Sequence, residues 1–147
     1  MRCTECGAFG VLHSGWRGTG ILAAAVEGLA ARFGSQPSAM AAVLGPAIGA
    51  CCYTVPEERA RSFAAEFGED SAAREGSVWR IDLRAANISL ARRLGLGSLL
   101  SIDACTCCDH RLGSYRREGP AAFTRMVAAC GVFPAGERLG LPWTESP

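Results

Sequence analysis

Residues 13–19, which read His-Ser-Gly-Trp-Arg-Gly-Thr, combine side chains that can bind ligands with glycines that permit close approach. His13 can bind a metal ion or transfer a proton near neutral pH. The planar guanidinium of Arg17 can form paired hydrogen bonds with a phosphate or a carboxylate. Gly15 and Gly18 carry no side chain and let the backbone come close to a ligand. The alternative interpretation is that the glycines only form a turn and that His13 only packs.

The sequence around this motif predicts a strand, a tight turn and a helix. An apolar run over residues 8–12 is typical of a strand. Residues 19–33 predict a helix that ends at Gly34, a residue type common just after helices. The apolar side chains of that helix recur at helical spacing: Leu22, Val26, Leu29 and Phe33. Sites in α/β proteins lie beyond the carboxyl ends of strands and at helix N-termini, which is where the motif falls.

The remaining elements predict an α/β or α+β layered fold. Helices are expected to begin at Pro56 and after Asp82, which is a favourable N-cap. Residues 68–76 are polar and are expected to form a surface loop. Apolar runs indicate further strands over residues 40–44, 78–81, 99–104 and 122–130. We therefore expect helices covering a mixed sheet in one domain over residues 1–133, followed by a flexible tail over 134–147.

Eight cysteines raise the question of a second, thiol-based site. Cys3 and Cys6 form a Cys-x-x-Cys pair, which is either half of a zinc or redox site or a loop remnant. Cys51 and Cys52 are adjacent, so strand-like alternation would point them to opposite faces and favours a core role. Residues 105–110 resemble a metal cluster, although cysteines so close in sequence cannot readily all reach one ion. One alternative is a small zinc protein built on Cys3, Cys6, Cys107, Cys108 and His110.

The segment from Ser114 to Arg117 is a second basic candidate. It places two guanidiniums beside a hydroxyl group. Strand-like alternation would send Arg116 and Arg117 to opposite faces. One of them would then face an anion, and the alternative is a solvated basic edge.

Composition narrows the class of partner. The net charge of +1 over 147 residues argues against nucleic-acid and membrane-surface binding. We see no signal peptide and no apolar run long enough to span a bilayer. Cysteines without a secretion signal favour free thiols and a cytoplasmic location.

Five segments, in order, resemble the YfiH family, also called the laccase-domain or multicopper polyphenol oxidase family. The first is residues 13–19, and the second is residues 45–55, Gly-Pro-Ala-Ile-Gly-Ala-Cys-Cys-Tyr-Thr-Val. The third pairs Ile-Asp-Leu at 81–83 with Asn87. The others are Cys-Thr at 105–106 followed by Ser-Tyr-Arg-Arg at 114–117, and Thr-Arg-Met at 124–126.

This resemblance implies a YfiH-like fold and a purine nucleoside phosphorylase. Such an enzyme uses phosphate to convert adenosine or inosine to free base and ribose 1-phosphate, and members also deaminate adenosine. It also implies a catalytic zinc ion held by two histidines and one cysteine, with copper as the alternative metal. His13 matches one of the ligands and is the metal-binding candidate. His13 and Arg17 are the catalytic candidates, and Arg17 and Arg116 are the substrate-binding candidates.

The chain lacks the family's N-terminal segments that carry the other two metal ligands. We therefore expect it to correspond to the C-terminal part of the fold, with an exposed apolar face through which copies could self-associate. Two alternatives to the phosphorylase remain: an inactive fragment or interaction module, and a polyphenol oxidase of the copper type.

Overall fold

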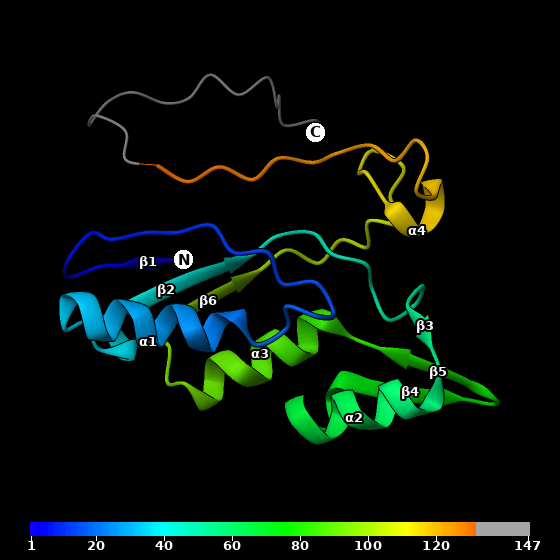
Figure 1. Cartoon of the computed structure of the whole chain (residues 1–147), viewed down its shortest axis with the longest axis horizontal. Coiled ribbons are helices and arrows are strands. Elements are labelled where there is room, and N and C mark those ends of the chain that lie inside the picture. Colours follow the sequence, from blue (N-terminus) through cyan, green and yellow to red (C-terminus); the bar gives the residue numbers. More distant parts are fainter. Residues whose placement is uncertain (132–147) are drawn as a thin grey trace, which may run out of the picture.

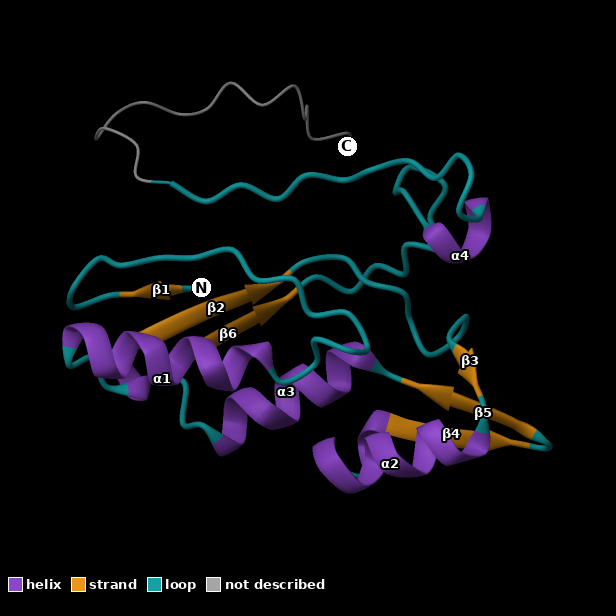
Figure 2. Ribbon diagram, in the orientation of Figure 1, coloured by secondary structure: helices purple, strands orange, loops and turns teal. Residues whose placement is uncertain are grey.

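The computed structural model describes residues 1–131 and shows a mixed α+β fold (Figure 1). Two small three-stranded sheets lie at opposite ends, and three helices pack against them (Figure 2). The expected tail over 134–147 and the last two residues of the expected domain lie outside the described residues. None of the helices in residues 1–131 has the length and apolarity needed to cross a membrane.

The first sheet is mixed, as expected, and has the strand order β1-β2-β6. Strand β2 (Met40–Leu44) pairs antiparallel with β1 (Arg2–Cys3) and parallel with β6 (Ser98–Ser101). Met40 and Ala42 are buried, whereas Val43 on the other face is 61% exposed. Helices α1 (Ile21–Phe33) and α3 (Leu83–Arg93) both lie on one side of this sheet (Figure 1).

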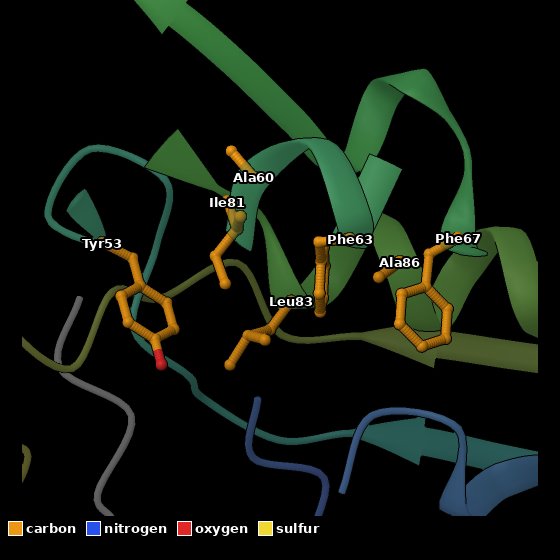
Figure 3. Close-up of a cluster of buried hydrophobic side chains, with 7 residues drawn as sticks. All are labelled: Tyr53, Ala60, Phe63, Phe67, Ile81, Leu83 and Ala86. Atoms are coloured by element: carbon orange, nitrogen blue, oxygen red, sulfur yellow. The ribbon is translucent and has the colours of Figure 1, made fainter. Parts of the chain in front are cut away.

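The second sheet is an antiparallel meander with the order β3-β5-β4. It comprises β3 (Thr54–Val55), β4 (Ala72–Glu75) and β5 (Val78–Ile81). Helix α2 (Glu57–Phe67) covers it and contributes Phe63 and Phe67, whose ring centroids are 4.7 Å apart. Figure 3 shows the resulting core, which is formed by Tyr53, Ala60, Phe63, Phe67, Ile81, Leu83 and Ala86.

Helix α3 connects the two halves of the fold. The Asp82 side chain accepts hydrogen bonds from the backbone N–H groups of Arg84 and Ala85, as expected of an N-cap. Leu83 and Ala86 near its start join the core of the second sheet. Leu90 near its end packs with Leu22 of α1 beneath the first sheet. Burying both ends of one helix holds the two sheets in a fixed relation.

Three further short elements lie within residues 1–131. The 3₁₀ turns η1 (Pro37–Ala39) and η2 (Glu69–Ser71) lead into β2 and β4, and the single-turn helix α4 is Tyr115–Glu118.

Three sequence-based expectations about elements were wrong. Residues 8–12 form an extended segment in which only Phe9 bridges to a strand, because its neighbour β1 is two residues long. Residues 68–76 contain η2 and β4 rather than a loop, since β4 pairs along the length of β5 despite its polar sequence. Residues 122–130 form no strand, and they pair with none of the strands within residues 1–131.

Candidate functional site

The His13 motif forms a compact turn ahead of α1. The N–H of Gly18 and the hydroxyl of Thr19 both donate to the carbonyl oxygen of Gly15, at 2.9 and 2.8 Å. A Cβ atom at Gly18 would lie 2.9 Å from the carbonyl oxygen of His13, so the turn requires glycine there. The His13 side chain is exposed rather than packed. The glycines therefore make the turn, and the turn presents His13 to solvent.

Helix α3 anchors this turn through a buried asparagine. The hydroxyl of Ser14 donates to Oδ1 of Asn87 at 3.0 Å, and Nδ2 of Asn87 donates to the carbonyl oxygen of Leu83 at 2.7 Å. Asn87 is only 5% exposed, and both polar atoms of its side chain have a hydrogen-bond partner, as buried polar groups require. A side-chain hydrogen bond thus ties the motif to a residue about seventy positions away in the chain.

Guanidiniums lie against aromatic rings at two places, one within the motif and one at Tyr53. The Cζ atom of Arg59 lies 4.1 Å from the ring centroid of Trp16, and that of Arg17 lies 5.1 Å from it. In a separate contact, the Cζ atom of Arg116 lies 5.2 Å from the ring centroid of Tyr53. Burial raises the pKa of Tyr53, and the positive charges of Arg116 and Arg59 oppose that rise. We call these five residues the arginine–aromatic surface.

This surface has the properties of an anion site. Within residues 1–131, none of its three arginines forms an ion pair with a carboxylate, unlike Arg61, Arg84 and Arg117. Unpaired guanidiniums bind phosphate strongly, and an aromatic face can stack on a planar base. Arg17 and Arg116 were sequence candidates. The sequence gives no sign of Arg59, because its contact with Trp16 depends on how α2 packs.

Arg116 and Arg117 make different contacts. The expected strand-like alternation was wrong, because both residues lie in a helix. They lie in α4, whose N-cap Ser114 accepts a hydrogen bond from the N–H of Arg117. Arg116 is exposed and lies over Tyr53. Arg117 points inward and donates to the carbonyl oxygens of Thr106 at 2.6 Å and Cys107 at 3.1 Å, among others. Arg116 is therefore the arginine of this pair that is free to meet an anion.

A cluster of four cysteines lies at the carboxyl ends of the parallel strands. β2 and β6 run side by side, and the loops that follow them leave the sheet together toward β3 and α4 (Figure 1). The loop after β2 carries Cys51 and Cys52, and the loop after β6 carries Cys105 and Cys108. All four Sγ atoms lie within 4.8 Å of one another.

Backbone contacts fix the geometry of this cysteine cluster. Ala47 pairs with Cys105 in an isolated parallel bridge, and the N–H of Gly49 donates to Sγ of Cys105 at 3.2 Å. Burial raises the pKa of Cys105, but the backbone N–H groups of Gly49, Cys108 and Cys107 outweigh it and lower the value to about 6. The pKa of Cys52 is raised, chiefly by its hydrogen bond with Cys108. The cluster therefore combines a ready thiolate with neighbouring thiols.

The two expectations about cysteines near this place need correction. Cys51 and Cys52 neither face opposite ways nor lie in the core: their sulfurs belong to one group, and Cys51 is exposed. The chain turns there, with the N–H groups of Cys52 and Tyr53 both donating to the carbonyl of Gly49. The proposed zinc set built on Cys3, Cys6, Cys107, Cys108 and His110 is not brought together. Cys3 and Cys6 instead lie beside Ser35, with Sγ atoms 3.1 and 3.3 Å from its hydroxyl oxygen.

Comparison with known proteins identifies the family. Residues 3–132 match the family described as multi-copper polyphenol oxidoreductase laccase. The chain belongs to this laccase family.

Relatives of this laccase-family chain include enzymes acting on purine nucleosides. It is 35% identical over 123 residues to the purine nucleoside phosphorylase LACC1 of Mus musculus, covering 76% of this chain and 28% of that protein. It is 32% identical over 114 residues to adenosine deaminase RL5 of an unknown prokaryotic organism, covering 73% and 44%. The crystal structure of YlmD from Geobacillus stearothermophilus superposes with a TM-score of 0.65 at 30% identity, covering 71% and 42%. The chain thus spans less than half the length of each of these three proteins.

The family description implies a metal, and His13 was the candidate ligand. Among residues 1–131, the one group of at least three His, Cys, Asp or Glu donors close enough to share an ion is the cysteine cluster, and His13 is not in it. The other histidine, His110, lies exposed in the loop after β6. The described residues therefore do not complete a metal site at His13, and we derive no chemical step through a metal there.

Proposed function

We propose that this chain forms part of a purine nucleoside phosphorylase that also deaminates adenosine, and that it supplies the phosphate- and nucleoside-binding surface. The observation that carries the proposal is the arginine–aromatic surface, which joins three arginines without carboxylate partners to the rings of Trp16 and Tyr53. The names of the relatives support the same reaction class.

The proposed reaction needs the two kinds of contact that this surface offers. In phosphorolysis a phosphate oxygen bonds to C1′ of the ribose while the bond from C1′ to the purine breaks, and the base leaves with the electron pair and takes up a proton. Arg17 and Arg116 would bind the phosphate or ribose, since guanidiniums pair with its oxygens in a fork. The ring of Trp16 would stack on the purine.

In this proposal His13 is one of three zinc ligands, and the other two come from outside residues 1–131. Zinc with three protein ligands keeps an open position for water or substrate. Copper and phenol oxidation remain the alternative that the family description suggests. The setting is proposed to be the cytoplasm, where the free thiols of this chain would stay reduced.

Calorimetric titration of the chain with inorganic phosphate and with inosine tests the surface. Replacing Arg17 or Arg116 with alanine removes a charge-assisted hydrogen bond worth about 1.5–3 kcal/mol, so phosphate affinity should fall about tenfold or more. Arg92→Ala is the matched control, because Arg92 is exposed on α3 and lies outside the surface.

Chromatography of free base after incubation with inosine and phosphate tests the activity. We expect slow turnover from this chain alone, because His13 cannot hold zinc by itself. A chain that binds neither phosphate nor inosine would contradict the proposal and favour the inactive interaction module.

A further inference from the structure

We infer that Cys51, Cys52, Cys105 and Cys108 form a second, structural zinc site that closes the loops after β2 and β6 on each other. This site is separate from the zinc position proposed at His13 and does not depend on the proposed enzymatic activity.

The spacing of the sulfurs fits one tetrahedral ion. Zinc binds thiolates at about 2.3 Å, which puts any two sulfurs of a tetrahedral site about 3.8 Å apart. The Sγ atom of Cys108 lies 3.6 Å from that of Cys51 and 3.3 Å from that of Cys52. All four lie within 4.8 Å of one another, so small side-chain rotations suffice to reach the ideal spacing.

The backbone around the cluster has the features of a metal-binding loop. Cys105 and Cys108 form a Cys-x-x-Cys turn in which the N–H of Cys108 donates to the carbonyl of Cys105 at 3.2 Å. A Cβ atom at Gly49 would lie 3.2 Å from Sγ of Cys51 and 3.2 Å from Cβ of Cys105, so glycine leaves the space that the sulfurs occupy. The hydrogen bond from Gly49 to Cys105 orients one ligand from outside, as such supporting contacts do in metal sites.

Four thiolates would bring negative charge to the loops that carry them, and two arginines hold the backbone of those loops. Zinc with four thiolates carries a net charge of −2, and each thiol gives up its proton to water on binding. Arg80 donates to the carbonyl oxygen of Cys51 at 2.8 Å, which ties β5 to the first loop. Arg117 holds the second loop through the carbonyls of Thr106 and Cys107. The backbone of each cysteine-bearing loop is therefore held by a guanidinium, and each of these guanidiniums is also paired with a carboxylate, that of Glu75 or Glu118.

Copper(I) and a disulfide are the two alternatives to zinc at the four cysteines. Soft thiolates also bind copper(I), but a closed site of four cysteines is typical of structural zinc. A disulfide needs its sulfurs about 2.05 Å apart, well short of the 3.3 Å between Cys52 and Cys108. Oxidation of this pair is thus a competing outcome rather than the state that the structure shows.

The experiment is the metal content of the purified full chain, measured by mass spectrometry of zinc and copper after dialysis under reducing conditions. We expect about one zinc ion per chain. Cys52→Ser and Cys108→Ser should lose most of it. Cys107→Ser, in the same loop but outside the group of four, should retain it, as should Cys130→Ser and His13→Ala.

A spectroscopic measurement keeps the test decisive if a serine variant fails to fold. Metal-stripped wild-type chain titrated with Co²⁺ should develop the visible bands of tetrahedral cobalt and the charge-transfer absorption of its thiolate ligands. Zinc lost in His13→Ala, zinc unchanged in Cys108→Ser, copper in place of zinc, or a disulfide between Cys52 and Cys108 in freshly reduced protein would each overturn the inference. Loss of phosphorolysis alone would not bear on it.

Discussion

Asn87 ties the His13 motif to helix α3 through its hydrogen bond with Ser14. It is buried in α3, and both polar atoms of its side chain are paired, one with Ser14 and one with the carbonyl of Leu83. Replacing Ser14 leaves Oδ1 of the buried Asn87 without its hydrogen-bond donor, which costs about 1–3 kcal/mol. Ser14→Ala should therefore lower the free energy of unfolding by about 1 kcal/mol, and Asn87→Ala by more, because it breaks two bonds.

Urea unfolding of the two single variants and the double variant measures the coupling between them. We expect a coupling energy of about 1 kcal/mol, since the residues are in direct contact. Ser89→Ala, on the same helix, is the control. Additive effects would show that the hydrogen bond does not hold the motif.

The adjacent cysteines show what residue patterns cannot reveal. Alternation assigns Cys51 and Cys52 to opposite faces only if the backbone is extended there, and in the structure it turns over Gly49. The sulfurs of the cluster come from loops more than fifty residues apart, so no local spacing could have joined them. Arg117 was visible as a basic residue, but its inward direction follows from the turn of α4.

Elements with strong local signals were predicted well. β2 and β5 coincide with the expected strands, and α3 begins after Asp82 as expected. α2 begins at Glu57, one residue after the expected start, with Pro56 as its N-cap. Gly34 ends α1 in the left-handed conformation, as expected. The failures share a cause, which is pairing with another segment of the chain or its absence. β4 has no apolar alternation but forms a strand because it pairs with β5. Residues 8–12 and 122–130 are apolar, but within residues 1–131 they join none of the sheets.

The short helix α4 stabilises the cysteine-bearing loop through one side chain, that of Arg117. Its guanidinium bonds to carbonyl oxygens along residues 106–112 and to Glu118 at 2.6 Å. Lysine keeps the charge but cannot spread its donors over the same carbonyls. Arg117→Lys should therefore destabilise the chain by about 2 kcal/mol and speed the loss of bound zinc to a chelator.

Arg116→Lys is the matched control for this prediction, because Arg116 is the neighbouring residue and is exposed. Thermal unfolding and a chelator-competition time course report on the two effects separately. Equal stability and equal release rates in both variants would show that the carbonyl contacts of Arg117 do not hold the loop.

At the scale of the whole molecule, helices within residues 1–131 cover the first sheet on one face only (Figure 1). α1 and α3 pack on the side of Met40 and Ala42, while the opposite side carries Val43 and Leu100, which pair in register and are 61% and 62% exposed. Exposed apolar patches on a sheet are sites of association, because burying them removes apolar area from water. The sequence resemblance led us to expect an apolar face through which copies associate, and Val43 and Leu100 are the candidates for it among residues 1–131.

We therefore predict that the chain self-associates through this face as its concentration rises, with sedimentation velocity as the measurement. Val43→Lys and Leu100→Lys place charges on the face and should shift the chain toward monomer, as lysine does on exposed sheets. Both side chains already contact water, so the substitutions should cost little stability. Val127→Lys, at a position that is 92% exposed and outside the sheet, should leave association unchanged.

A wild-type chain that stays monomeric at all concentrations would contradict the prediction. If the variants with both lysines still associate, the contact must lie elsewhere, and the candidate is the outer edge of β6, which pairs with no further strand among residues 1–131.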